Sequence, residues 1–338
     1  MSATKFPVGL QFNVEDLIRT IKNKSTKVST IGIWGVGGSG KTTLARAIYH
    51  QIHGTFTEKS FIEDISEVKQ SGSRVCLQEQ LLSDILKLKV KITCDEMGRR
   101  IIRERLNGKR VLIVLDDVSK NGPLDLLESS SLFGEGSVII ITTREEKVLR
   151  KHQVDSVFRI NLMNPNESLE LLSWHAFREP KPKESYNYLA KTVVTFCGGL
   201  PLTLEVIGTY LFERTQIEWD VILNKLAKIP HNNVLRILKI SFDGLCNKME
   251  KYLFLDVCSF FVGKDRAYVR ETLNGCGVDA DSGIRVLIDR NLIKLKRNNT
   301  FGMHPLLQEM GRKIDHRKGE ERYALEETDV RTFFYIWF

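Results

Sequence analysis

The sequence predicts an α/β fold in which a doubly wound parallel sheet is followed by a helical domain and a winged-helix domain. Three observations lead to this prediction. Apolar runs at 28–34, 111–115 and 138–141 alternate with segments of helical apolar spacing, as in a parallel sheet covered by helices. Beyond residue 150 the spacing is helical, and 284–303 indicates a helix, a turn and a short hairpin. We therefore expect a lead-in segment at 1–27, the α/β domain at 28–150, a helical domain at 151–232, a winged-helix domain at 233–315 and a divergent tail at 316–338.

A glycine-rich loop joins the first of these strands to a helix within the stretch I-G-I-W-G-V-G-G-S-G-K-T-T-L. It fits the P-loop spacing G-x-x-x-x-G-K-[ST], with Gly35, Gly40, Lys41 and Thr42 at the defining positions. Glycines let backbone N–H groups close round a phosphate chain, and the helix adds its first amides and its dipole. The lysine reaches the β- and γ-phosphates, and the threonine hydroxyl can ligate Mg²⁺. A nucleoside polyphosphate is the predicted ligand, since the strand-loop-helix setting argues against a chance match.

Two carboxylates, Asp116 and Asp117, follow the apolar run Val111–Leu115. In open α/β sheets, ligands bind at the carboxyl ends of the strands. A buried strand that ends in two acids matches the Walker B partner of a P-loop, so we expect Asp116 to hold Mg²⁺ and Asp117 to orient or deprotonate the attacking water. An ordinary turn built from two aspartates is the alternative.

A second apolar run, Val138–Ile141, ends in Thr142, Thr143 and Arg144. An arginine at the carboxyl edge of a neighbouring strand offers a planar fork to phosphate oxygens. We expect Arg144 to contact the γ-phosphate. A surface ion pair of Arg144 with Glu145 or Glu146 is the alternative.

The remaining elements follow from hydrophobic periodicity and from turn residues. One more strand is predicted at 60–65, and no strand is predicted between residue 151 and about residue 290. The hairpin partners are 292–295 and 301–303. Further helices are predicted at 14–22, 43–50, 77–88, 96–106, 164–177, 188–197, 223–229, 234–242 and 249–261, and another opens at Pro201.

Composition excludes several classes of protein. The 338 residues are 42% hydrophobic, and no apolar run reaches the length of a bilayer span or forms a secretion signal, so we expect a cytoplasmic protein, or a nucleocytoplasmic one, with no membrane contact. The six cysteines are scattered, without zinc-ligand spacing. The net charge of +8 is dispersed, and the arginines at 99–105 fit the solvent face of a helix, so nucleic acid is an unexpected partner.

The ordered motifs resemble one family: the NB-ARC nucleotide-binding region of plant disease-resistance receptors, within the signal-transducing P-loop ATPases. The sequence at 61–84 and 254–261 resembles the subclass that carries a TIR domain, as in TMV resistance protein N-like receptors. Ser119 departs from that subclass, which usually has aspartate at this position. The motifs stand in the family's order: G-V-G-G-S-G-K-T-T at 35–43, V-L-I-V-L-D-D-V at 111–118, I-I-I-T-T-R at 139–144, C-G-G-L-P-L at 197–202, F-L-D-V-C-S-F-F at 254–261 and M-H-P-L-L-Q-E-M-G-R at 303–312.

The resemblance implies a set of site residues. The lead-in covers the base, Pro201 packs near adenine and ribose, and His304 reaches the β-phosphate of ADP. The implied contacts to adenine nucleotide are Val8, Gly9, Leu10, Gly35, Gly37, Gly38, Ser39, Gly40, Lys41, Thr42, Thr43, Arg144, Pro201 and His304. The implied Mg²⁺ ligands are Thr42 and Asp116, and the implied catalytic residues are Asp117, Asp116 and Lys41.

The resemblance also implies a function, an ADP/ATP switch that is closed with ADP, opened by ATP and reset by slow hydrolysis. Partners would be other resistance receptors, or further copies of the chain in the ATP state. An ATP-dependent transcription regulator that uses its winged helix on DNA is the alternative, and a turnover enzyme such as a P-loop kinase is a third candidate.

Three departures from the family's pattern bear on this function. Pro305 replaces the aspartate of the family's M-H-D motif, which predicts weaker retention of ADP. No TIR or coiled-coil domain is expected before residue 6, and no leucine-rich repeat after 315. The apolar end F-F-Y-I-W-F indicates a truncated receptor, or a helper that contacts other receptors through that tail.

Overall fold

The computed structural model describes residues 5–23, 27–63, 65, 73–119, 132–152, 154–230, 233–275, 280–296 and 298–322. The chain divides into two compact units, Met1–Leu162 and Met163–Phe338, which are described one after the other. The predicted tail motif F-F-Y-I-W-F lies outside the described residues. Within the described part of the chain, no helix combines the length and the apolar character that crossing a bilayer requires.

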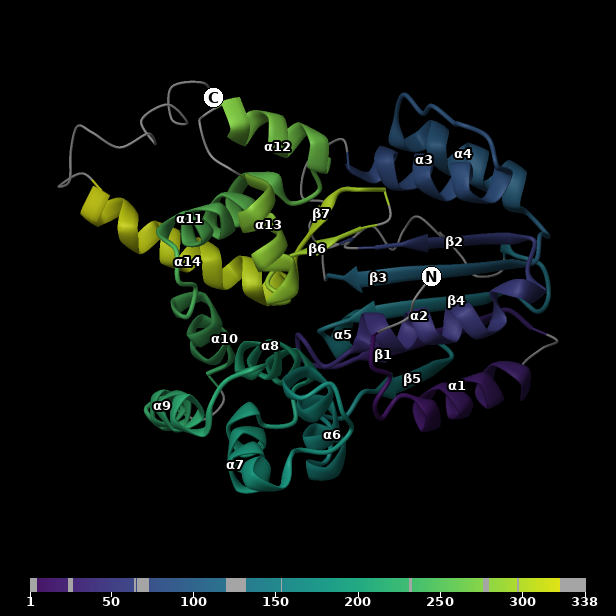
Figure 1. Ribbon diagram of the computed structural model, residues 1–338. Helices are drawn as coiled ribbons and strands as arrows, with labels where there is room; N and C mark the ends of the chain where they lie inside the picture. Colours follow the sequence, from purple (N-terminus) through teal and green to yellow (C-terminus); the bar gives the residue numbers. More distant parts are fainter. Residues whose placement is uncertain are drawn as a thin grey trace. The chain divides into compact units, whose positions relative to one another are not determined.

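The first unit is built on a five-stranded parallel sheet (Figure 1). Its strand order is β2-β3-β4-β1-β5, which places the glycine-loop strand β1 beside β4. The strands are β1 (Ser29–Trp34), β2 (Glu58–Ile62), β3 (Val111–Val118), β4 (Val138–Thr143) and β5 (Ser156–Arg159). The predicted doubly wound parallel sheet is therefore confirmed. Because the strands are parallel, their carboxyl ends all lie at the same edge of the sheet.

Alternate residues of the central strands serve two separate cores, one on each face of the sheet. Leu112 and Val114 face the first core, and Ile113 and Leu115 face the second. The first core is closed by α1 (Gln11–Asn23) and α2 (Lys41–Ile52), and the second by α3 (Ser73–Leu86), α4 (Asp95–Leu106) and α5 (Glu146–Lys151). The amphipathic helix predicted at 14–22 is thus α1, and it packs on α2 as part of the domain core.

The prediction that no strand occurs between residue 151 and about residue 290 is wrong, because β5 spans Ser156–Arg159 and pairs in parallel with β1. Its side chains are half-buried or exposed, so its sequence lacks the apolar run that marks the inner strands. Hydrogen bonding to β1 defines it instead, and the Asp155 carboxylate accepts from the Thr30 amide at 2.7 Å. The first unit therefore reaches Leu162.

The second unit begins with a group of helices. Asn164, Thr215 and Asn247 cap three helices of the unit, each with a glutamate three residues later that bonds back to the cap. Its helices are α6 (Pro165–Ala176), α7 (Asn187–Cys197), α8 (Pro201–Leu211), α9 (Gln216–Ala227) and α10 (Val234–Asp243).

A winged helix follows in the same unit, as predicted. Its core joins residues of α8 and α10 to the winged-helix elements, with Phe254 and Phe301 fully buried. The predicted hairpin is the antiparallel pair β6 (Lys294–Leu295) and β7 (Phe301–Gly302). The helices are α11 (Lys248–Asp256), continued by a π-helical turn at Val257–Phe261, then α12 (Arg266–Gly275), α13 (Ala280–Asp289) and α14 (Pro305–Arg322).

Candidate functional site

The glycine loop between β1 and α2 has the backbone of an anion cradle. Gly38 and Gly40 have φ of 80° and 92°, a left-handed conformation that glycine adopts without strain. Gly40 is the N-cap of α2 and supplies no side-chain cap. The first amides of α2 and its dipole are thus directed to the loop, an arrangement that suits a phosphate group.

Gly35 opens the loop where it presses against the end of β5. A Cβ built on Gly35 would lie 2.5 Å from Cγ2 of Ile160 and 3.1 Å from the Ser39 hydroxyl. The Ile160 amide donates to the Trp34 carbonyl at 2.9 Å, so Ile160 is held in place by backbone as well as by packing. The residue that directly follows the strand missed by periodicity therefore packs against the phosphate loop.

We predict that Gly35→Ala disrupts the loop. The added methyl group meets a β-branched side chain that cannot swing away, so overpacking should lower the free energy of unfolding by about 1–3 kcal/mol. Nucleotide binding should weaken with it. Gly54→Ala is the matched control, since a Cβ there meets nothing within 4 Å. Denaturant unfolding of the two variants tests this, and equal stabilities would contradict the packing argument.

Lys41 is buried at the start of α2, where its Nζ donates to the carbonyls of Gly35 and Val36 at 2.9 and 2.8 Å. The pKa of Lys41 is lowered from 10.5 to about 8, chiefly because the side chain is buried; the charge of Asp117 opposes this shift, Arg144 adds to it, and Asp116 opposes it. Without a bound ligand, the ammonium group is thus poorly solvated. A polyphosphate beside it would favour the charged form.

This pKa predicts a pH dependence of nucleotide affinity. Below pH 8 Lys41 carries its proton before binding, whereas above pH 8 binding must take up a proton. The affinity for ADP should therefore fall about tenfold between pH 7 and pH 9. Titration calorimetry in buffers of different ionisation enthalpy would show the proton uptake at pH 9. An affinity that does not change with pH would contradict a lowered pKa.

Asp116 is buried at the carboxyl end of β3 and receives two hydroxyl groups. Thr42 Oγ1 lies 2.9 Å from both carboxylate oxygens, and Thr142 Oγ1 lies 2.6 Å from Oδ1. A threonine hydroxyl and a carboxylate are the hard oxygen donors that Mg²⁺ takes together with substrate phosphates. No cluster of three or more metal-ligating side chains occurs among the described residues, so these two donors would need phosphate oxygens to complete a Mg²⁺ site.

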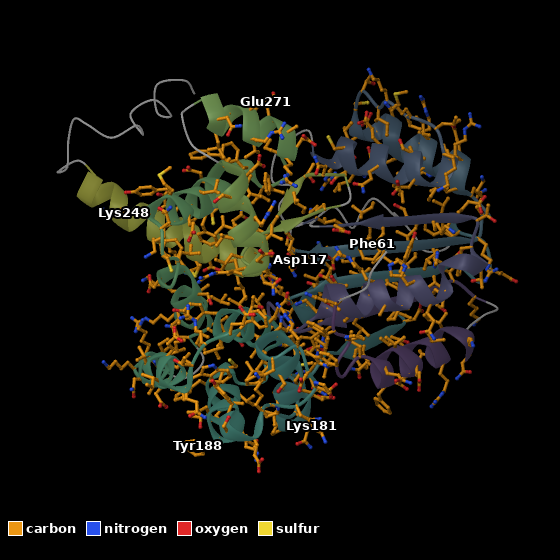
Figure 2. The ribbon with its side chains drawn as sticks, in the orientation of Figure 1. Phe61, Asp117, Lys181, Tyr188, Lys248 and Glu271 are labelled. Carbon is orange, nitrogen blue, oxygen red and sulfur yellow. The ribbon has the colours of Figure 1, made fainter. Side chains whose placement is uncertain are left out.

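Asp117, which is labelled in Figure 2, forms a bidentate ion pair with Arg144, at 3.1 and 3.0 Å. Strand β3 continues through both acids to Val118, which excludes the alternative of a simple aspartate turn. The alternative ion pair of Arg144 with Glu145 or Glu146 is not observed. Arg150 pairs with Glu146 instead, at 2.7 Å.

The other predicted site residues fall in both units. In the first unit, Val8 is buried, Gly9 has φ of 68°, and Leu10 packs on the core of α1 and α2. Ser39 is buried in the loop, and its hydroxyl has no hydrogen-bond partner among the described residues. Gly37 lies in the loop, and Thr43 lies in the first turn of α2.

Pro201 and His304 belong to the second unit. Pro201 is the first residue of α8, where its missing N–H costs nothing. His304 precedes α14, and its Nδ1 accepts from the Leu306 amide at 3.1 Å. That bond leaves Nε2 as the protonated nitrogen of the neutral ring.

The structure therefore brings together the loop, Lys41, Thr42, Asp116, Asp117 and Arg144, as the sequence predicted. This combination of a glycine loop on a helix N-terminus with two acids at the carboxyl end of β3, a strand of the same sheet, defines a P-loop nucleotide-binding protein. The NB-ARC domain profile matches residues 11–182, and a winged-helix domain of the Roq1-like disease resistance protein type matches 247–318. The chain belongs to the NB-ARC family, as the resemblance indicated.

Named relatives agree with this assignment. The chain is 40% identical over 314 residues to disease resistance protein RUN1 of Vitis rotundifolia, covering 92% of this chain and 23% of RUN1. It is 35% identical to TMV resistance protein N of Nicotiana glutinosa, covering 91% of this chain and 27% of that protein. The chain thus spans about a quarter of the length of these relatives.

Among solved structures, a signal-transduction ATPase with a tetratricopeptide repeat sensor from Pyrococcus horikoshii superposes with a TM-score of 0.51 at 17% identity. The match covers 88% of this chain and 42% of that protein. At this identity the likeness shows the fold alone.

Proposed function

We propose that this chain is the ADP/ATP switch of a plant disease-resistance receptor, closed with ADP and opened by exchange for ATP, with slow hydrolysis as its reset. One observation carries the proposal: Lys41, the Thr42–Asp116 pair and the Arg144–Asp117 pair lie together at the carboxyl edge of one sheet. The names of RUN1 and of TMV resistance protein N support the setting in plant defence. The resemblance to the TIR subclass and a cytoplasmic location belong to the same proposal.

Within the first unit each side chain has a distinct task. Lys41 neutralises the β- and γ-phosphates, and Thr42 and Asp116 hold Mg²⁺, which supplies charge neutralisation at the phosphates when it is bound. Arg144 offers its guanidinium fork to the γ-phosphate, the group that distinguishes ATP from ADP. Asp117 orients or deprotonates the attacking water.

The second unit would sense which nucleotide is bound. A ligand can shift a conformational equilibrium only through unequal affinity for the two states. We assign Pro201 to contacts with adenine and ribose, and the Nε2–H of His304 to the β-phosphate of ADP. The hydrogen bond from the Leu306 amide fixes the tautomer in which Nε2 is a donor, which supports this role.

Mass analysis of the nucleotide released from the native protein tests the proposal. We expect ADP in the purified protein, replacement by ATP on incubation with excess ATP and Mg²⁺, and a change in hydrodynamic radius on exchange. Protein that contains no nucleotide and produces no heat when ADP or ATP is added would overturn the proposal.

Pro305 leads to a further prediction about retention of ADP. Proline suits the first position of α14, but it replaces the aspartate that the resemblance to the family's M-H-D motif leads us to expect there. Pro305→Asp should slow ADP release several-fold, and aspartate is also favourable in the first turn of a helix. Pro305→Ala is the control, because it removes the ring without adding charge. Near-complete ADP occupancy that Pro305→Asp leaves unchanged would contradict the prediction.

The charge of the winged helix argues against DNA as the ligand. Helix α13 precedes the hairpin, in the place of a recognition helix, and it carries Asp281 and Asp289 against Arg285. Recognition helices are normally basic, because they approach phosphates. A salt-dependent affinity for duplex DNA would reverse this conclusion. The partners we propose are adenine nucleotide, other resistance receptors and, in the ATP state, further copies of this chain.

A further inference from the structure

Thr142, the fifth residue of β4, touches both acids of the site at once. Its side chain is fully buried, and its Oγ1 lies 2.6 Å from Oδ1 of Asp116 and 2.8 Å from the backbone nitrogen of Asp117. The amide of Asp117 can only donate, so the hydroxyl accepts that bond and gives its single proton to Asp116. One hydroxyl therefore links the carboxylate of one acid to the backbone of the other.

The backbone of Asp117 needs such support. Its φ is 55°, in the left-handed region that residues with a side chain seldom adopt, and the β3–β4 pairing shifts register between Leu115 and Val118. Unusual backbone conformations persist where surrounding contacts fix them. Thr142 makes the contact to this residue itself, because its Oγ1 accepts from the Asp117 amide at 2.8 Å.

The two carboxylates at the end of β3 meet different partners. Asp116 faces Thr42, while Asp117 faces Arg144. Successive side chains of a strand already alternate between its two faces, so the left-handed conformation of Asp117 does not create this separation; it sets the backbone from which the Asp117 carboxylate reaches Arg144. The Thr142 hydroxyl bonds both to that backbone and to the Asp116 carboxylate.

We propose that Thr142 is a positioning residue of the nucleotide site. It orients Asp116 for the Mg²⁺ of a nucleoside di- or triphosphate complex, and it fixes the backbone that keeps Asp117 on Arg144. The inference rests on the proposed nucleotide-binding function. A valine of the same shape would remove a donor from Asp116 and leave the Asp117 amide without its acceptor.

The test measures the affinity of a fluorescent ADP analogue in Mg²⁺ and in EDTA, for the full chain and three variants. The quantity of interest is the gain in affinity that Mg²⁺ provides. Thr142→Val should reduce that gain about tenfold or more, since partners that orient metal ligands usually contribute that much. The affinity in EDTA should stay close to that of the wild type.

Two variants separate positioning from general packing. Thr142→Ser retains the hydroxyl and should restore the Mg²⁺-dependent gain. Thr143→Val removes a neighbouring buried hydroxyl that bonds Val118 rather than the acids, and it should leave the gain unchanged. Circular dichroism checks folding, and Thr142→Ala, which lacks the same hydroxyl, is measured if Thr142→Val does not fold.

The outcomes distinguish the two levels of the proposal. If Thr142→Val keeps the wild-type gain in affinity from Mg²⁺, the role of Thr142 is overturned. The same holds if Thr143→Val loses as much of that gain as Thr142→Val. In both cases the proposed function still stands. A wild-type protein that binds no ADP analogue under either condition overturns the proposed function and this inference with it.

Discussion

Lys41→Arg should leave a folded protein that no longer retains nucleotide. The ammonium group of Lys41 is buried and donates to two loop carbonyls. The guanidinium group of arginine is larger and planar, so it cannot occupy the same position with the same hydrogen bonds. Loss of two charge-assisted contacts to phosphate is worth roughly a hundredfold or more in affinity. Mass analysis of released nucleotide, compared with wild type, should show little or no ADP in the variant.

The control for this change is Lys59→Arg. Lys59 also donates its Nζ to a backbone carbonyl, that of His53 at 3.0 Å, but it lies on β2 away from the glycine loop. Its nucleotide content should match that of the wild type. A Lys41→Arg protein with full ADP occupancy would show that the loop binds phosphate without this lysine.

Asp117→Asn should slow the proposed hydrolysis of ATP about a hundredfold or more while ATP still binds. Asparagine keeps the shape of aspartate and can still meet the guanidinium of Arg144, but it cannot take a proton from water. Removing a general base typically costs a hundredfold or more in rate. Single-turnover release of phosphate from bound ATP measures the chemical step, and direct titration measures the binding.

The matched control is Asp243→Asn, which neutralises an aspartate in a surface ion pair with Lys239 at 2.7 Å. The Asp243→Asn protein should hydrolyse ATP at the wild-type rate, since an exposed ion pair contributes little to stability. If Asp117→Asn hydrolyses ATP at the wild-type rate, water is activated by another group, and Asp117 serves only to hold Arg144.

Local sequence was sufficient for the strands that are buried on both faces. Val138–Ile141 and Val111–Leu115 are apolar at every position because each face of the sheet packs on its own core. The glycine loop was equally legible, since its backbone demands glycine at particular positions. Both features can be recognised from a short stretch of sequence, because the residue types that they require are close together in the chain.

Strand β5 was missed for the opposite reason. Its four residues are half-buried or exposed, and it is a strand because β1 offers it hydrogen bonds. Ile160 leaves no room for a side chain at Gly35. The sequence gave no sign of this contact, because Gly35 lies 125 positions earlier in the chain. The role of Thr142 was equally hidden, although a threonine at the end of a buried strand beside two acids could have suggested it.

By itself the sequence determined that this protein has a phosphate-binding loop, a buried strand that ends in two acids and a family membership. Each of these depends on residue types at fixed spacing. Only the tertiary structure decided that Asp116 meets Thr42 and Asp117 meets Arg144, because these partners lie 74 and 27 positions away in the chain, in other parts of the fold. Hydrogen bonds between residues far apart in the chain have no periodicity, so only the folded protein reveals them.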